Sequence, residues 1–263
     1  MDLTNIDQIT QLLKKHKLHT KKHLGQNFLI DRSALEEIVK AADIQSTDHI
    51  IEVGPGLGVL TVEIAEKAKK VTSIEIDSAL FPILKDTLSQ HKNIDLLNED
   101  ALQFRPPKTP YKLVANIPYY ITSPLINHFL QSENPPQTIT LLIQKEVAEK
   151  ACQLEPKASI LSLQIGLFGN AKIVGIIKAE SFFPAPKVDS AIIHIETHNK
   201  ISIPEARQIL SLAKRAFSNK RKKLSNTVLR EIEDSPIDKD LRPQVLSIKD
   251  WQKLNNFFNS SKK

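Results

Sequence analysis

The chain has 263 residues, 41% of them hydrophobic and 25% charged, as is usual for a globular protein with room for one large domain and a small one. Its single cysteine excludes an intrachain disulfide and argues against a structural zinc site. The sequence shows neither a signal peptide nor the ~18 consecutive apolar residues of a membrane span, so we expect a cytoplasmic protein. The formal net charge of +6 at pH 7 favours a polyanionic partner, either nucleic acid or a membrane surface.

After a polar, basic lead-in over residues 1–30, the predicted elements alternate between helices and strands. Helices are expected over 33–42, 60–68, 77–90 and 146–152, and strands over 49–53, 71–76, 94–97, 113–115 and 138–143. Apolar stretches follow over 161–168, where we expect a strand, and over 173–177. The alternation predicts an α/β fold, Rossmann-like, with a mostly parallel sheet covered by helices on both faces.

From about residue 200 the pattern is helical throughout. Helices are expected over 204–217, 220–231, 236–246 and 249–258, with polar or proline-containing joins between them. We therefore divide the chain into an α/β domain over 1–199 and a small helical domain over 200–263.

Polar side chains stand at the ends of four predicted strands: Glu52, Glu75, Asp100 and Asn116. The carboxyl ends of parallel strands meet at one edge of the sheet, where such folds bind their ligands. Four polar residues at that edge indicate a binding site.

The turn after the first strand contains Gly54, Gly56 and Gly58, which let the backbone pass close to a ligand. Their spacing differs from the Gly-x-Gly-x-x-Gly of nicotinamide-binding enzymes. Glu75 is placed to accept hydrogen bonds from both hydroxyls of a ribose, and Asp100 from an adenine amine. A cofactor with ribose and adenine but no pyrophosphate fits, which indicates S-adenosylmethionine. The alternative is a turn that only packs a helix on a strand, with Glu75 solvated and Asp100 capping a turn.

The run Asn116-Ile117-Pro118-Tyr119 combines an amide, a carbonyl and an aromatic ring within four residues. The side-chain oxygen of Asn116 and the carbonyl of Pro118 can accept both N–H bonds of an adenine amine, and Tyr119 can stack on the base. Phe182 can stack on the opposite side of the base. The alternatives are a proline-bounded loop with an Asn cap, and a Phe that only anchors packing.

The basic residues are clustered in two blocks. The first contains Lys14, Lys15, Lys17, Lys21 and Lys22, and the second contains Lys214, Arg215, Lys220, Arg221, Lys222 and Lys223. Most charge runs are merely solvated surface. Two blocks on a basic chain favour RNA or DNA, and we expect Lys220, Arg221, Lys222 and Lys223 to bind RNA.

These motifs together resemble the bacterial small-subunit (16S) rRNA adenine N6-dimethyltransferase family, whose name derives from kasugamycin resistance. The matching segments are Gly25-Gln26-Asn27-Phe28-Leu29, residues 52–61, Glu75-Ile76-Asp77, Asn116-Ile117-Pro118-Tyr119, residues 144–148, residues 182–190 and residues 217–226. The resemblance implies that Asn27 and Leu29 touch the cofactor. It also implies dimethylation of N6 on two adjacent adenosines in the loop of the 3′-terminal helix of 16S rRNA. The expected partner is 16S rRNA within the immature small subunit, with no membrane partner, and we expect a monomer.

The chain departs from the family pattern at three places. Lys157-Ala158 stands where an aromatic-Gly pair is usual, Tyr120 where Asn is common, and Lys220 where Arg is frequent. Two other readings stay open. One is a large-subunit (23S) rRNA adenine methylase of the antibiotic-resistance type, which shares the Asn-Ile-Pro-Tyr motif; the other is a non-catalytic RNA-binding assembly or transcription factor.

Overall fold

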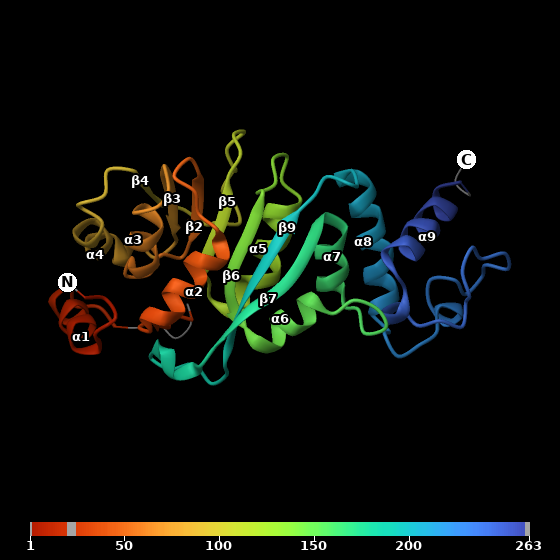
Figure 1. The fold of residues 1–263 in the computed structure, drawn as a ribbon. Coiled ribbons are helices and arrows are strands. Elements are labelled where there is room, and N and C mark those ends of the chain that lie inside the picture. Colours follow the sequence, from red (N-terminus) through yellow and green to blue (C-terminus); the bar gives the residue numbers. More distant parts are fainter. Residues whose placement is uncertain (1, 20–24, 261–263) are drawn as a thin grey trace. The chain divides into compact units, whose positions relative to one another are not determined.

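The computed structural model describes residues 2–19 and 25–260, so Lys21 and Lys22 of the first basic block lie outside the described residues (Figure 1). The chain forms two compact units. Unit 1 comprises residues 1–148 and 172–197, and unit 2 comprises residues 149–171 and 198–263. Residues 149–171, which we assigned to the α/β domain, thus group with the C-terminal helices.

Unit 1 is organised around a seven-stranded sheet with the strand order β4-β3-β2-β5-β6-β9-β7 (Figure 1). The strands are β2 (His49–Val53), β3 (Lys70–Glu75), β4 (Ile94–Asn98), β5 (Lys112–Asn116), β6 (Thr138–Gln144), β7 (Gly169–Ile177) and β9 (Ser190–Thr197). The first five are mutually parallel, and β9 runs antiparallel to β6. The predicted mostly parallel α/β sheet is confirmed. Strand β9 was not predicted.

Helices cover the sheet because their apolar residues recur on one face. In α2 (Arg32–Ala42), Leu35, Ile38 and Val39 are buried against the sheet together with Ile64 of α3 (Val59–Ala65). Helix α5 (Thr122–Leu130) lies on the other side of the sheet (Figure 1). Connections between parallel strands are right-handed, so the connecting helices change sides when successive strands are added in the opposite direction across the sheet. Strands β3 and β4 are added on one side of β2, and β5 and β6 on its other side, so the topological switch point of the sheet lies between β2 and β5.

Two smaller assemblies complete unit 1. Helix α1 (Ile6–Lys15) buries Ile9, Leu12 and Leu13 in a cluster with Ile83 of α4 (Phe81–Thr87). Strand β1 (Phe28–Leu29) pairs antiparallel with β8 (Phe182–Phe183), which joins segments about 150 residues apart in the sequence. The predicted helix over 77–90 is shorter and begins with the 3₁₀ turn η2 (Ser78–Leu80).

Unit 2 contains the helices α7 (Ile160–Phe168), α8 (Ile203–Phe217) and α9 (Ile248–Ser260), while α6 (Lys145–Cys152) begins in unit 1 and ends in unit 2. Trp251 of α9 is fully buried and stacks on Phe217 with ring centroids 6.1 Å apart. No helix of the described residues has the length and apolar character needed to cross a bilayer.

Three predicted elements are wrong. The strand expected over 161–168 is helix α7, which begins with a capping box between Ser159 and Ser162. The helices expected over 220–231 and 236–246 are turns, with only the 3₁₀ turns η5 (Leu224–Asn226) and η6 (Pro243–Val245). Four adjacent cations repel one another in the first segment, and prolines interrupt the second, so neither can sustain a helix.

Candidate functional site

A cleft opens at the carboxyl ends of β2 and β5, at the switch point of the sheet. Its empty space is about 1180 Å³, including the part open to solvent. It is lined by every residue predicted to contact the cofactor or the base: Asn27, Leu29, Gly54, Gly56, Glu75, Asp100, Asn116, Pro118, Tyr119 and Phe182. The fold therefore brings both predicted sites into one cavity of unit 1.

The glycine turn bends so that only glycine fits without strain. Gly54, Gly56 and Gly58 have φ angles of +70°, +61° and +91°, in the region that side-chain-bearing residues avoid. A Cβ at Gly56 would lie 3.3 Å from the ring of Phe28, and one at Gly58 would lie 3.1 Å from Leu88. The turn thus packs closely on the N-terminal motif and on the end of α4, in addition to lining the cleft.

Glu75 ends β3 with its carboxylate facing the glycine turn. Its Oε1 accepts a hydrogen bond of 2.8 Å from the Asp77 N–H, and its Oε2 one of 3.4 Å from the Gly56 N–H. Burial raises the pKa of Glu75. Each carboxylate oxygen has room for a second donor, so Glu75 can also accept hydrogen bonds from both hydroxyls of a ribose.

Asp77 and Gln26 link the second cofactor motif to the N-terminal motif. The Gln26 Nε2 donates to Asp77 Oδ2 at 2.9 Å, while Asp77 Oδ1 accepts from the Ala79 N–H at the start of η2. Asn27 lies beside them and donates to the Gly25 carbonyl at 3.2 Å. This linking contact of Gln26 was not predicted.

Asp100 follows β4 and caps a turn. Its Oδ1 accepts from the Leu102 N–H at 2.9 Å. The capping alternative is therefore present in the structure. A carboxylate has a second oxygen, so this cap is compatible with the predicted contact to an adenine amine.

The carboxyl group of Glu52 is buried under the glycine turn. It accepts a hydrogen bond of 2.8 Å from the Ser73 hydroxyl, and it lines the cleft floor. Burial raises the pKa of Glu52 to about 7, from an ordinary value of 4.5. At neutral pH this group thus titrates in the folded protein.

Glu52 makes the stability of the cofactor-free protein fall as pH rises from about 4.5 to about 7. In that range the carboxyl group is ionised in the unfolded chain but still protonated in the fold, so the proton favours the folded state. We expect a loss of about 3 kcal/mol in the free energy of unfolding over this range. Urea denaturation of the wild type and of Glu52→Gln at pH 5, 6, 7 and 8 measures it.

The matched variant isolates this effect from other titrations. Burial lowers the pKa of His49 and His194, and those groups make stability rise with pH, the opposite sign. Because the two histidines are unchanged in Glu52→Gln, the difference between the two curves reports Glu52 together with its charge coupling to Glu75. Equal pH slopes for the two proteins would contradict the assignment.

Asn116 and Pro118 meet the glycine turn across the cleft. Asn116 ends β5, and a Cβ at Gly54 would lie 3.8 Å from its carbonyl oxygen. Gly25 approaches Pro118 so closely that its Cβ would lie 3.2 Å from the proline ring. The Pro118 carbonyl accepts the Ile121 N–H at 3.2 Å, so one of its two lone pairs is already engaged. One acceptor direction remains for a base amine.

Tyr119 is held by its hydroxyl group. The hydroxyl lies 2.9 Å from the Ser190 Oγ at the start of β9, and the Tyr119 carbonyl accepts from the Thr122 hydroxyl at 3.1 Å. Burial raises the pKa of Tyr119, so the phenol is neutral at physiological pH. A ring fixed at both ends is suited to stacking rather than to proton transfer.

Phe182 is buried in the core cluster that also contains Leu29, and it lines the cleft. Both alternatives for this residue, packing anchor and cleft wall, are therefore compatible with its position. Ser181 before it donates to Asp31 Oδ2 at 2.7 Å, and this bond lowers the pKa of Asp31. The β1–β8 pairing places Phe182 opposite Leu29.

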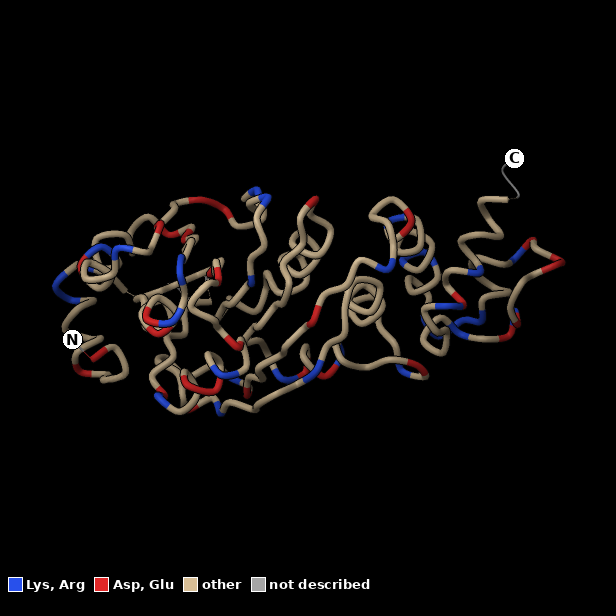
Figure 2. The backbone as a smooth tube through the Cα atoms, turned by 45° about the horizontal axis from the view of Figure 1, so that its top comes forward, with Lys and Arg blue, Asp and Glu red and all other residues tan. Residues whose placement is uncertain are grey.

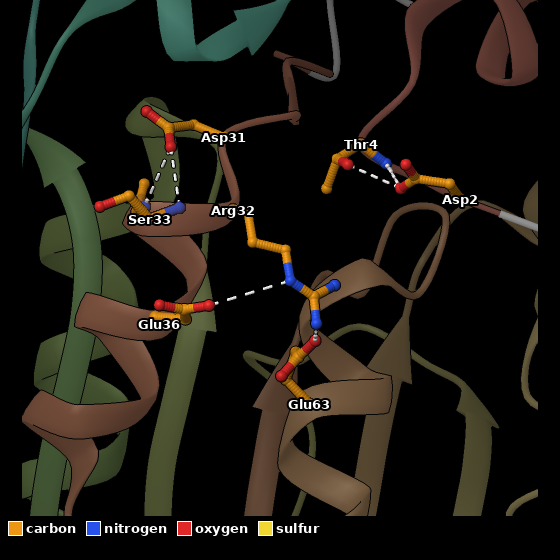
Figure 3. Close-up of polar contacts among 8 residues, drawn as sticks. Asp2, Thr4, Asp31, Arg32, Ser33, Glu36 and Glu63 are labelled. Carbon is orange, nitrogen blue, oxygen red and sulfur yellow. Dashed lines mark hydrogen bonds and ion pairs between the residues drawn. The ribbon is translucent and has the colours of Figure 1, made fainter.

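The segment after β1 is anchored by the first turn of α2. Asp31 accepts hydrogen bonds from the Ser33 and Ala34 N–H groups, as an N-cap does, and Figure 3 shows its carboxylate above Ser33. In the same view Arg32 reaches Glu63 of α3 at 3.3 Å and Glu36 at 3.9 Å. These contacts connect the helix that follows the N-terminal motif to the helix that follows the glycine turn.

The cleft also contains two exposed apolar side chains that were not predicted as site residues. Ile76 and Tyr120 both line the cleft, although 56% and 59% of their surface is exposed. Exposed apolar surface beside a cavity is typical of ligand contacts. Ile76 follows Glu75 directly, and this adjacency was the signal that could have identified it.

The four residues Lys220, Arg221, Lys222 and Lys223 lie in unit 2 and are all exposed. Figure 2, in which Lys and Arg are blue, shows several basic stretches in the C-terminal part of the tube. Lys223 pairs with Asp240 at 3.2 Å. Among the described residues, no group of three or more His, Cys, Asp or Glu side chains could hold a metal ion.

The chain is similar to known proteins over most of its length. The family model "Ribosomal RNA adenine dimethylase" matches residues 17–258. A relative from Alkaliphilus oremlandii, named ribosomal RNA small subunit methyltransferase A, is 37% identical and covers 94% of both chains. A relative of the same name from Clostridium botulinum is 35% identical over 94% of this chain and 96% of its own.

Two solved structures have similar folds. The 23S rRNA methyltransferase ErmE is 28% identical, with a TM-score of 0.73 over 89% of this chain and all of its own. A dimethyladenosine transferase from Plasmodium falciparum is 27% identical, with a TM-score of 0.73 over 88% of this chain and 97% of its own.

Proposed function

The chain belongs to the ribosomal RNA adenine dimethylase family, and on that premise we propose that it methylates N6 of two adjacent adenosines in the loop of the 3′-terminal helix of small-subunit rRNA. It is an S-adenosylmethionine-dependent enzyme. The observation that carries the proposal is the shared cleft, which Asn116, Pro118 and Tyr119 line together with the glycine turn and the acidic strand ends.

The cofactor half of the cleft suits a ribose and an adenine. Glu75, whose carboxylate is held by two backbone N–H groups, would accept hydrogen bonds from the ribose hydroxyls, and Asp100, which also lines the cleft, would accept one from the adenine amine. Ile76 offers apolar surface beside them. When bound, the cofactor supplies an electrophilic methyl group on a sulfonium.

The base half of the cleft orients the nucleophile. An adenine amine is a weak nucleophile because its lone pair is delocalised into the ring. Acceptors at Asn116 Oδ1 and the Pro118 carbonyl hold its two N–H bonds and turn the lone pair towards the methyl donor. Tyr119, fixed through Ser190, stacks on the base, with Phe182 as the other wall. After transfer the extra proton can leave to water.

The same two acceptors explain how the product leaves. The first methylation replaces one N–H bond, and the second replaces the other. A dimethylated amine has no donor, so Asn116 and Pro118 both lose their partner. The doubly methylated base therefore binds more weakly than the substrate base.

The small-subunit assignment rests on overall similarity. Curated relatives that are named ribosomal RNA small subunit methyltransferase A match this chain at 34% to 37% identity over 92% to 94% of its length. We propose that the substrate is 16S rRNA within the immature small subunit, bound by a monomer of this chain.

Mass spectrometry of rRNA from cells with and without this protein tests the proposal. We expect two dimethyladenosines in the 3′-terminal region of the small-subunit rRNA only when the protein is present. Modification of large-subunit rRNA instead would support the antibiotic-resistance type. Unchanged rRNA in both subunits would favour the non-catalytic assembly factor.

Lys220, Arg221, Lys222 and Lys223 are proposed to bind the RNA phosphates. When the logarithm of the RNA-binding constant is plotted against the logarithm of the salt concentration, each phosphate contact contributes roughly 0.7–0.9 to the steepness of the slope. Replacing all four residues by Ala should therefore make that slope shallower by about three. Affinity should fall by roughly tenfold or more at low salt. Filter binding of small subunits across a salt series measures both quantities.

The control for this variant lies elsewhere in unit 2. Lys249 and Lys253 of α9 are two exposed cations outside the cluster, and their double Ala variant should leave the salt slope nearly unchanged. Calorimetry with S-adenosylmethionine should give equal affinity for all variants. An unchanged salt slope in the fourfold variant would exclude these residues from the RNA contact.

A further inference from the structure

Tyr120 occupies an unusual position at the rim of the cleft. It lines the cavity, yet 59% of its surface is exposed, the largest fraction among the exposed large apolar side chains of the described residues. The structure gives its side chain neither a hydrogen bond nor a ring contact within the part of the chain described here. An exposed, unanchored aromatic ring beside a cavity has an apolar face available to a ligand.

The local backbone directs this ring away from its neighbour. Tyr119–Ile121 forms the 3₁₀ turn η3, closed by the Ile121 N–H on the Pro118 carbonyl. With three residues per turn, successive side chains diverge by about 120°. Tyr119 reaches inward to Ser190, so Tyr120 cannot share its direction. The two rings therefore serve different surfaces of the cleft.

The chemistry of the substrate supplies an occupant for that surface. An adenine whose amine enters the cleft must leave its stack, which uncovers one face of the adjacent base. Single-stranded RNA bases that lose a stacking partner are commonly received by an aromatic side chain. In the proposed substrate the adjacent base is the second target adenine.

We propose that Tyr120 stacks on the base next to the adenine in the cleft, and so positions the RNA for transfer. The proposal rests on the proposed function, because it requires a base in the cleft. Tyr120 is a positioning residue for the RNA, distinct from Tyr119, which contacts the reacting base. Its ring face, and not its hydroxyl group, carries the role.

Steady-state kinetics of three full-length variants test this role on small ribosomal subunits from cells that lack the enzyme. Tyr120→Ala should raise KM for the subunits by roughly tenfold to a hundredfold, the range expected for loss of one base stack. Its kcat should stay within about threefold, because stacking acts equally before and during transfer. Tyr120→Phe keeps the ring and should stay within about threefold of the wild type in KM.

Two matched controls separate stacking from other roles. Val174→Ala also trims an exposed apolar side chain of unit 1, outside the cleft, and should change nothing. Ile76→Ala trims the other exposed large apolar side chain of the cleft and should weaken S-adenosylmethionine binding while leaving KM for the subunits within about threefold. Thermal unfolding checks the fold of every variant, and calorimetry with S-adenosylmethionine should give unchanged affinity for Tyr120→Ala.

Three outcomes would overturn the role of Tyr120: an unchanged KM in Tyr120→Ala, a loss in cofactor affinity instead, or equal defects in Tyr120→Phe and Tyr120→Ala. Each of these outcomes can be read only if the wild-type enzyme methylates the small subunits in the same assay. If the wild type itself leaves them unmodified, it is the proposed function that fails, so the two failures are distinguishable.

Discussion

Replacing Asn116 by Ala should lower kcat by roughly 10²–10³-fold while the affinity for S-adenosylmethionine changes by only about threefold. The reason is that Asn116 ends β5 on the base side of the cleft, where its side-chain oxygen is proposed to hold one N–H bond of the target amine. Without that acceptor the lone pair is no longer directed at the methyl group. Single-turnover methylation of small subunits at saturating cofactor measures the transfer step.

A conservative variant sharpens this test. Asn116→Asp keeps an oxygen acceptor at the same distance from the backbone, so it should retain more activity than Asn116→Ala. Thermal unfolding of each variant checks that the fold is intact. Comparable losses in turnover and in cofactor affinity would refute the role of Asn116 as the acceptor for the base.

Replacing Glu75 by Ala should have the opposite signature. We expect S-adenosylmethionine affinity to fall by about 10²–10⁴-fold, because two charge-assisted hydrogen bonds to a ribose are lost and each contributes roughly 1.5–3 kcal/mol. At saturating cofactor, kcat should stay within about tenfold of the wild type, since the base side of the cleft is unchanged. Isothermal titration calorimetry measures the affinity.

Glu75 also has a structural role, which the controls must separate. Its carboxylate holds the Asp77 and Gly56 N–H groups, so its loss can loosen the glycine turn. Glu75→Gln keeps one carbonyl oxygen and should lose less affinity than Glu75→Ala. Glu66→Ala removes an exposed carboxylate outside the cleft and should bind cofactor as the wild type does. If Glu75→Ala binds S-adenosylmethionine within about fivefold of the wild-type affinity, the ribose contact is excluded.

The elements that the sequence predicted correctly are those with a local signal. Strands β2 and β5 are short apolar runs with a polar residue at or next to their carboxyl end, and both were predicted within one residue of their observed bounds. Helix α7 was misread because it is apolar on nearly every side, and such a run cannot be distinguished from a buried strand by periodicity. Its packing against α8 and α9 within unit 2 stabilises the helix, in addition to the Ser159 cap.

The two halves of the site differ in how far the sequence could predict them. The strand ends Glu75 and Asn116 were predictable, since parallel strands must deliver their carboxyl ends to one edge. The contacts of Gln26 with Asp77 and of Tyr119 with Ser190 join residues 51 and 71 positions apart. No local pattern encodes such a pair, because it forms only after the strands have assembled.

The sequence by itself determined the chemistry of this protein: which acceptors, acids and aromatic rings it carries, and at which strand ends they stand. The tertiary structure alone decided that Phe182 is brought beside Leu29 through the β1–β8 pairing, and that Tyr119 is fixed while Tyr120 is left exposed. The physical reason is that residue type and strand ends are local properties, whereas burial and long-range pairing depend on the closure of the whole core.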